Sequence, residues 1–327
     1  RKMAYFISDQ LNLNKEKIEI AASVSKSDLV SGLVGEFPEL QGVMGKYFAL
    51  NQGFEEDVSR AISEHYLPTS ISSSVSKKPI SYALSIIDKL DTLVGFYLID
   101  QKPTSSKDPF ALRRAAIGLL RTIIENNLVI KISDLIEYSI KIYLDQGVKD
   151  LNNKVPKDLI IFFRERMKNI LKEKKIRADI IEASVSSHVY DNFLELYKKT
   201  LIMNKFISKD LGKNAVSTYK RASNILDQEK SLLKNGPDAV LFKYEEEKEL
   251  FEKINSIRKS FTLKDEKKNY ENHLRLLSDT KLSTDKFFDN VKVNDENKDL
   301  KNNRLELLQI LCSTFNSFVD FSKLEGT

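Results

Sequence analysis

Apolar residues recur three and four positions apart along most of this chain, the spacing of one face of an α-helix. In the first third, this spacing and the turn-forming residues between segments predict helices at 2–11, 15–24, 27–35, 38–50, 55–65, 80–99 and 109–125. Pro38 suits the first turn of its helix. The segment 80–99 is long and mostly apolar, so we expect it to be buried. Residues 68–79 are rich in Ser and Pro, which predicts a loop.

The rest of the chain continues the helical pattern. A helix is expected from Ile132 to near Gly147, and another begins at Pro156. The basic run at 172–177 is interpreted as closing this second helix, because cations stabilise a helix C-terminus, with RNA contact as the alternative. Further helices are expected at 190–206, 213–228, 238–256, 264–275 and 299–322, with an irregular polar stretch at 276–297. We find no internal repeat and no strand alternation, so the predicted fold class is all-α.

Composition supports this fold class and sets the domain plan. The 327 residues include 11 Gly, 7 Pro and no Trp, so turn formers are scarce and long helices are favoured. Hydrophobic residues make up 41% of the chain, enough for more than one core. We divide the chain into 1–126, 127–188 and 189–327. It begins Arg1-Lys2 without an initiator Met, and we expect it to be a piece of a longer protein.

Cysteine usage and hydropathy indicate the compartment. Cys312 is the only cysteine, which excludes an internal disulfide and a cysteine-cluster zinc site. It lies on an apolar helix stripe and is interpreted as a small core residue. No apolar run approaches the ~18 residues of a membrane span. We therefore expect a cytoplasmic protein without a membrane segment.

The positive charge is concentrated in the middle of the chain. The net charge is +5, yet residues 1–126 hold 15 Lys and Arg against 15 Asp and Glu. Residues 151–235 hold 18 against 10, an excess of 8 positive charges. This excess is typical of a phosphate-facing surface. Lysine-rich, solvated helix faces are the alternative interpretation.

The segment 103–116 combines turn residues with a helix start that carries two arginines. Asp108 can cap the first turn and Pro109 fits the first helical position. Arg113 and Arg114 then follow, although cations are favoured near the opposite end of a helix. We expect a compensating anion, either a neighbouring carboxylate or an RNA phosphate.

Local motifs for catalysis are missing from this sequence. There is no GxxxxGK[ST], GxGxxG or HExxH, so nucleotide cradling and zinc hydrolysis have no local support. His65 has Asp88 and Asp91 downstream, a set that could in principle hold a metal. A lone His favours a capping or packing role. Asp88 and Asp91 are expected to pair with cations rather than act as an acid and base couple.

Long motifs in the first region resemble the beta subunit of bacterial tetrameric glycyl-tRNA synthetase. They are LVGEFPELQGVMGKY at 33–47, AISEHYLP at 61–68, DKLDTLVG at 88–95 and the segment 107–116. The order and spacing are those of the family. The carboxy-terminal part resembles the family more loosely, through KRASNIL at 220–226, FFDNVKV at 287–293, NRL at 303–305 and DFSKL at 320–324.

The resemblance implies the carboxy-terminal half of a subunit in an alpha-2 beta-2 ligase that attaches glycine to tRNA-Gly. In this family the alpha subunit carries the site for glycine, ATP and the adenylate, and the beta subunit binds tRNA. No cofactor is therefore expected in this fragment, with ATP and Mg used by the alpha subunit, and the fragment alone is expected to be inactive. The partners implied are tRNA-Gly and the alpha subunit.

The resemblance also implies that 1–126 is an HD-like helical domain and that 189–327 is a helical anticodon-binding domain, joined by a helical linker at 127–188. HD phosphohydrolases need a His-Asp pair, whereas this chain has Ser27-Asp28 and His65-Tyr66 in the corresponding places. We expect the fold without that chemistry and without a metal. A metal-dependent HD phosphohydrolase and a helical scaffold without RNA contact remain the rival functions.

RNA binding requires cations for phosphates and planar or amide side chains for unpaired bases. On the helix 213–228 we predict that Lys220 and Arg221 contact the anticodon arm. Asn224 contacts either a base or the domain core.

Two further predictions concern the other arginines. Arg304 either pairs with Asp289, the interpretation we favour, or reaches RNA. Lys107, Arg113 and Arg114 face the tRNA acceptor arm or the alpha subunit; a buried pair with one of the acidic residues Glu36, Glu39, Asp88 and Asp91 is the alternative.

Overall fold

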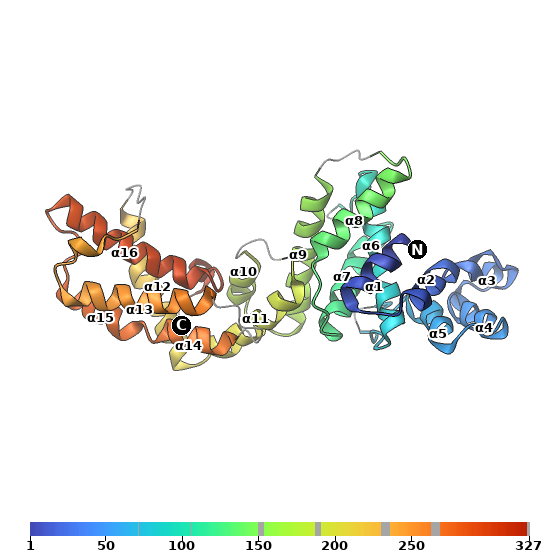
Figure 1. The fold of residues 1–327 in the computed structure, drawn as a ribbon, viewed down its shortest axis with the longest axis horizontal. Coiled ribbons are helices and arrows are strands. Elements are labelled where there is room, and N and C mark those ends of the chain that lie inside the picture. Colours follow the sequence, from blue (N-terminus) through green and yellow to red (C-terminus); the bar gives the residue numbers. More distant parts are fainter. Residues whose placement is uncertain are drawn as a thin grey trace. The chain divides into compact units, whose positions relative to one another are not determined.

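A computed structural model describes residues 1–70, 72–104, 106–149, 154–186, 191–229, 236–262 and 269–325. All regular elements in these ranges are helices, which confirms the predicted all-α class (Figure 1). None of the described helices is long and apolar enough to cross a membrane. The chain forms two compact units, residues 1–170 with 191–195 and residues 171–190 with 196–327. The division at 126 and 188 stays a prediction, as does the likeness of residues 1–126 to HD folds.

Unit 1 is built around the apolar helix α6, Pro79–Leu98. Leu90, Leu93 and Val94 of this helix are fully buried, and α6 packs against α1, α2, α5, α7 and α8. Each fully buried leucine contributes about 2 kcal/mol of hydrophobic stabilisation. The elements of unit 1 are α1 (Lys2–Leu11), α2 (Lys15–Val24), η1 (Ser27–Val30), α3 (Gly32–Glu36), η2 (Pro38–Leu40), α4 (Val43–Asn51), α5 (Glu56–Glu64), α6, α7 (Leu112–Glu125), α8 (Ile132–Asp145) and most of α9 (Val155–Glu173).

Two predicted helices of unit 1 are each broken into shorter pieces. The segment 27–35 is interrupted at Ser31, whose extended backbone lets its hydroxyl accept a hydrogen bond from the Val34 amide and cap α3. The segment 38–50 is interrupted at Gly42, which has a φ of 78°. That left-handed conformation suits glycine and ends helical continuity. Periodicity alone missed both breaks because the apolar residues continue through them.

Unit 2 is a helical bundle in which α12 and α13 pack against α14, α15 and α16. The side chain of Asn297 accepts hydrogen bonds from the Asp299 and Leu300 amides and so starts the last long helix. The elements of this unit are α10 (Ala178–Ser186), most of α11 (Phe193–Ile207), α12 (Asp210–Gln228), η3 (Ala239–Leu241), α13 (Glu245–Thr262), α14 (Tyr270–Ser278), α15 (Lys281–Asn290), α16 (Lys298–Asn316) and η4 (Phe321–Lys323).

The prediction of an irregular stretch at 276–297 is wrong, because α15 lies within it. Its sequence is mostly polar and only Thr284 and Phe287 are buried, so the periodic signal is weak. The helix α10 was likewise not predicted. The helix expected at 264–275 corresponds to α14, and its first residues, 264–268, lie outside the described ranges.

Candidate nucleic-acid interface

The start of α7 is capped by a carboxylate of its own chain. Asp108 accepts hydrogen bonds from the Leu112 amide at 2.8 Å and from the Arg113 amide at 3.0 Å. The predicted capping role of Asp108 is thus confirmed. The prediction that Pro109 begins the helix is wrong, since residues 109 and 110 form a turn and Ala111 has a φ of 53°. The anion that compensates the positive end of the helix is therefore the Asp108 carboxylate.

The two arginines of α7 differ in their surroundings. Arg113 is half-buried and its guanidinium donates to the carbonyl oxygen of Thr104. Arg114 and Lys107 are exposed, and neither side chain has a hydrogen bond or ion pair among the described residues. None of the four acidic residues considered as partners pairs with either arginine. Asp88 instead binds Lys26, with Oδ1 2.9 Å from the ammonium nitrogen.

These arginines line two adjoining cavities in unit 1. One cavity of about 660 Å³ is lined by Arg113, Arg114 and the hydroxyl-bearing residues Thr69, Ser70 and Ser72. A second of about 500 Å³ shares Arg114 and also contains Asp88 and Lys89. Guanidinium and hydroxyl groups commonly donate hydrogen bonds to phosphate oxygens in proteins. The arrangement therefore offers donors to an anion at Arg113 and Arg114, while each cavity is also lined by one carboxylate, Asp108 in the first and Asp88 in the second.

Lys89 positions the backbone beneath these cavities, a role that sequence reasoning missed. Its buried ammonium donates to the carbonyl oxygens of His65 (3.0 Å) and Leu67 (2.9 Å) and to the Ser85 hydroxyl (2.8 Å). Burial lowers the pKa of Lys89 to about 8. Three oxygen acceptors satisfy a charge that would otherwise be costly to bury. Only the three-dimensional fold brings these groups together, because Lys89 lies 22 residues from Leu67.

His65 belongs to a buried hydrogen-bonded cluster. Its Nδ1 donates to the Ile62 carbonyl oxygen at 2.8 Å, and its Nε2 accepts from the Lys26 ammonium at 2.9 Å. Burial and the nearby Lys26 charge lower the pKa of His65 to about 4, so the ring is neutral at pH 7. Lys26 also lies over the Tyr66 ring at 4.1 Å. The packing role predicted for His65 agrees with this geometry.

The rival metal site gains no support from this cluster. Both ring nitrogens of His65 are occupied by protein groups, and the Lys26 ammonium lies between His65 and Asp88. The Lys26 ammonium therefore occupies the position that a metal would take and neutralises the Asp88 carboxylate. Among the described residues, no three His, Cys, Asp or Glu side chains are grouped to hold a metal ion.

In unit 2, the predicted RNA-binding residues of α12 fall into two classes. Lys220 is half-buried and Asn224 is exposed, and neither side chain has a partner among the described residues. The exposure of Asn224 argues against its alternative role in the domain core. Arg221 instead pairs with Asp285 at 3.2 Å and lies over the Phe288 ring at 4.4 Å, which joins α12 to α15. Such exposed pairs contribute about 0–1 kcal/mol and exchange readily.

Arg304 is a core residue, and its predicted contacts need correction. It is 1% exposed and cannot reach RNA in this fold. Its guanidinium donates to Glu247 Oε1, Asp295 Oδ2 and the Lys292 carbonyl oxygen, each at 2.8 Å. The prediction that Arg304 pairs with Asp289 is therefore wrong. Glu247 also accepts from the Lys243 and Tyr244 amides, so the pair anchors the start of α13 to α16.

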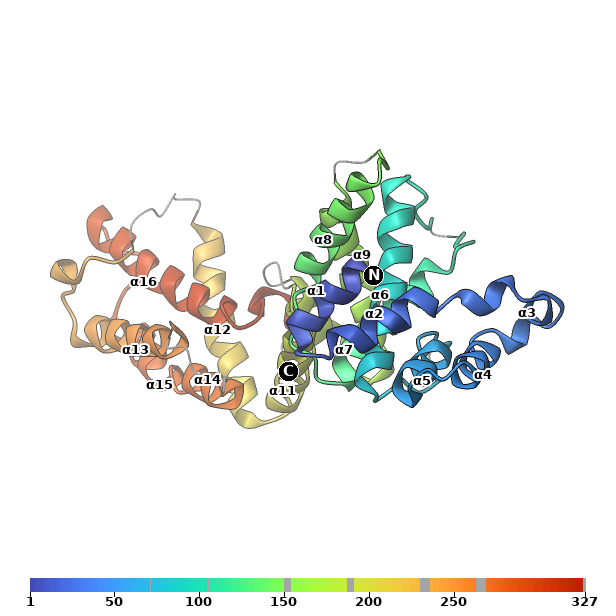
Figure 2. The same ribbon diagram turned by 45° about the vertical axis from the view of Figure 1, so that its right-hand side comes forward.

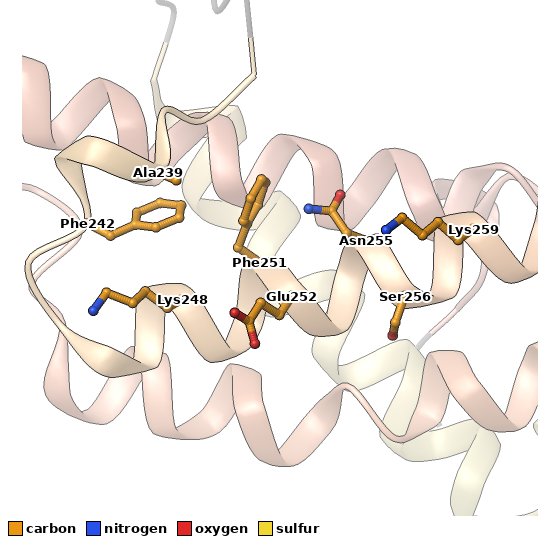
Figure 3. Close-up of a pocket in the computed structure, with 8 residues that line it drawn as sticks. All are labelled: Ala239, Phe242, Lys248, Phe251, Glu252, Asn255, Ser256 and Lys259. Carbon is orange, nitrogen blue, oxygen red and sulfur yellow. The ribbon is translucent and has the colours of Figure 1, made fainter.

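A cavity of about 610 Å³ along α13 was not predicted (Figure 3). Phe251, Asn255 and Lys259 are spaced by four residues along α13; the Phe251 ring lies toward Ala239 and Phe242, and the Lys259 side chain extends toward Asn255 (Figure 3). The Phe251 ring meets Phe242 edge to face, with ring centres 5.3 Å apart. Lys248, Glu252 and Ser256 form the second row. The recurring four-residue spacing of an aromatic, an amide and a cation was the available sequence signal.

This cavity has the components of an unpaired-base site. A half-exposed aromatic ring offers a stacking surface, and the Asn255 amide, without a hydrogen bond among the described residues, offers a donor and an acceptor. Lys248 and Lys259 supply positive charge beside them.

Comparisons with known proteins agree with the architecture. Residues 1–186 match the family model described as glycyl-tRNA synthetase beta subunit, and residues 215–321 match the one described as DALR anticodon binding domain. The chain is similar to a glycine–tRNA ligase beta subunit of Rickettsia akari, 40% identical over 312 residues. It is also 38% identical over 317 residues to the corresponding protein of Rhodospirillum centenum.

These matches cover 95% of this chain but only 45% and 44% of the two relatives, so the chain spans less than half of their length. The fold and the second family match define an all-helical protein with a domain of the DALR anticodon-binding class. The chain belongs to the glycyl-tRNA synthetase beta subunit family.

Proposed function

We propose that this chain is the tRNA-binding part of a glycyl-tRNA synthetase beta subunit and supports ATP-dependent attachment of glycine to tRNA-Gly. The observation that carries the proposal is the match of residues 215–321 to an anticodon-binding domain, on a unit with an exposed amide-bearing helix and an aromatic cavity. The chemistry belongs to the alpha subunit, which uses ATP and Mg²⁺. This part needs no cofactor and is inactive alone. Its compartment is the cytoplasm.

In this proposal unit 2 holds the anticodon arm. Lys220 contacts a phosphate, and Asn224, one helical turn further along the same face, contacts a base. Phe251 stacks with an unpaired base in the α13 cavity. Arg221 contributes only when it leaves Asp285, and Arg304 takes no part because it is buried.

Unit 1 contacts the acceptor arm through Lys107, Arg113 and Arg114. The exposed Arg114 beside two cavities supports this role, since no carboxylate of the described fold neutralises it. Contact with the alpha subunit is the other role open to these three cations. The phosphohydrolase alternative is disfavoured by the engaged His65 and Asp88.

The test is the affinity of tRNA-Gly for the chain, measured by fluorescence anisotropy across a salt series. Lys220→Glu is expected to weaken binding roughly tenfold, because one phosphate contact is lost. The salt slope, which is the steepness of the fall in log affinity with log salt concentration, should decrease by about 1. Phe251→Ala is expected to cost about 1–3 kcal/mol of binding free energy through lost stacking. Charge reversal at Arg221 is less informative, because it would place a third carboxylate beside Asp285 and Asp289.

The matched control is Lys298→Glu, which reverses an exposed lysine of α16 that has no partner among the described residues. This variant measures the general effect of reversing one positive charge, and its affinity for tRNA-Gly should stay within twofold of the wild-type value. Binding that does not respond to salt, or no binding by the wild-type chain, would support the scaffold alternative. Equal losses from Lys220→Glu and Lys298→Glu would show that binding depends on net charge rather than on this face.

A further inference from the structure

The short helix α4 has an unusual distribution of large and small residues. Its buried positions are Gly45 and Ala49. Val43, Tyr47 and Leu50 are 44%, 59% and 39% exposed. These three residues are spaced by four and three positions, so they lie on one face of the helix. The apolar stripe of α4 therefore faces away from its own domain.

The domain holds α4 through its small residues. A Cβ at position 45 would come within 2.7 Å of Ile62 Cγ2 and 3.0 Å of Asp28 Cγ. The buried Asp28 carboxylate accepts hydrogen bonds from the amides of Gly42 at 2.6 Å and Gly45 at 3.2 Å. Close packing on α5 and this carboxylate fix the helix, so its large apolar residues are not needed to hold it in place.

Neighbouring elements extend the apolar surface. Leu29 and Val30 lie on η1, Leu33 on α3, and Phe37 just before η2, and all four side chains are exposed, Val30 to 90%. η1 contacts both α3 and α4. Figures 1 and 2 show α3 and α4 at the edge of unit 1, away from α8. We call residues 29–50 on this edge the α4 surface. A cluster of this kind on one edge marks an interaction site.

The charges on the α4 surface select the class of partner. Lys46 is the only Lys or Arg between residues 29 and 50. Glu36 and Glu39 are exposed and have no ion pair among the described residues. RNA phosphates would meet apolar side chains and two carboxylates, which disfavours nucleic acid. A protein that presents an apolar groove with a basic rim fits both the stripe and the charges.

We propose that the α4 surface binds the alpha subunit of glycyl-tRNA synthetase, with Val43, Tyr47 and Leu50 as anchors in a groove of that subunit. The relatives of this chain are named beta subunits, a name for one of at least two kinds of chain in an enzyme. The identity of the partner rests on the proposed function. The anchors are distinct from Arg113 and Arg114 and lie on other elements of unit 1.

The experiment uses the full-length beta subunit and measures its affinity for the purified alpha subunit by interferometry. Tyr47→Lys combined with Leu50→Lys removes two anchors and introduces charges that oppose a basic rim. We expect alpha-subunit affinity to fall at least tenfold and tRNA-Gly affinity of the isolated beta subunit to stay within twofold. The matched control, Val240→Lys with Leu282→Lys, changes two exposed apolar residues of unit 2 and should leave alpha-subunit affinity unchanged.

Two further measurements test the proposal even if the Tyr47→Lys and Leu50→Lys double variant does not fold. Glu36→Lys with Glu39→Lys changes only exposed side chains and should also weaken alpha-subunit binding. In the wild-type protein, amide hydrogen exchange of residues 43–51 should slow when the alpha subunit is added. Unchanged exchange and unchanged affinity in both double variants would overturn the proposal.

Other results would assign the surface to a different occupant. A beta subunit that dimerises alone, and becomes monomeric in the Tyr47 and Leu50 variant with normal alpha-subunit affinity, would assign it to a second copy of this chain. Loss of tRNA-Gly affinity with normal alpha-subunit affinity would assign it to RNA. If the wild-type chain binds alpha subunit but no tRNA, the proposed tRNA function fails while this proposal stands.

Discussion

Arg304 and Arg114 have the same side chain in opposite surroundings. Arg304 is buried and donates to two carboxylates and a carbonyl oxygen, which join α13 to α16. Arg114 is exposed beside two cavities and has no partner among the described residues. Burying a charge is costly unless it is paired, whereas an exposed charge stays hydrated at little cost. The comparison separates an arginine that stabilises the fold from one that is available to a ligand.

The largest expected effect is on the buried arginine. Arg304→Met leaves the buried Glu247 carboxylate without its cation and should lower the free energy of unfolding of unit 2 by about 3–5 kcal/mol. Urea unfolding followed by circular dichroism measures this loss. The double variant Arg304→Met with Glu247→Gln should recover part of it, because the uncompensated charge is removed. A loss below about 1 kcal/mol in the single variant would contradict the structural role.

A pH series extends the comparison to the buried cluster near Arg114. The pKa of His65 is lowered to about 4 by burial and by Lys26, whereas an unfolded histidine titrates near 6.5. Between these values the unfolded chain binds the additional proton. Stability of unit 1 should therefore be complete above about pH 6.5 and fall as the pH is lowered toward 4, by about 1.4 kcal/mol per pH unit at most.

The measurement for this pH dependence is urea unfolding of wild-type protein and His65→Gln between about pH 7 and pH 4.5. The variant removes the titrating group and should flatten the dependence on pH in this window. The carboxylates of the protein contribute equally to both curves, so the difference between the two curves isolates His65. Parallel curves would show that the buried ring does not remain neutral in the folded state.

The smallest effect on stability is expected at the exposed arginine. Arg114→Gln should change the free energy of unfolding by less than about 0.5 kcal/mol, because no described contact is lost. The affinity of the Arg114→Gln variant for tRNA-Gly should nevertheless fall several-fold, and the salt slope should decrease by about 1. Arg60→Gln, which breaks an exposed pair with Glu56 on α5, is the matched control and should leave tRNA affinity unchanged. An Arg114 variant with normal tRNA affinity would instead favour a subunit contact.

Much of the fold could be predicted because helix formation depends on neighbours in sequence. The spacing of apolar residues located α1, α2, α5, α6 and α8 to within a few residues, and Asp108 was correctly assigned as a cap. Short breaks were harder. Gly42 and Ser31 interrupt helices whose apolar pattern continues, and α15 has too few buried residues to produce a clear stripe.

The candidate sites were harder to predict because partners come from distant parts of the chain. Arg304 meets Glu247, 57 residues away, rather than the nearer Asp289. Arg221 meets Asp285 on another helix, although sequence alone placed it on RNA. The α13 cavity depends on η3 folding over Phe251, so neither its depth nor its lining follows from spacing alone.

The sequence by itself determined the all-helical fold, most helix positions and the family, since periodicity and long motifs are local properties of the chain. Only the tertiary structure decided which charges are buried and which remain available. It buried Arg304, left Arg114 without a carboxylate and turned the apolar stripe of α4 outward. The physical reason is that burial and ion pairing are set by the packing of helices against one another, and helices of similar amphipathic pattern can pack in more than one way.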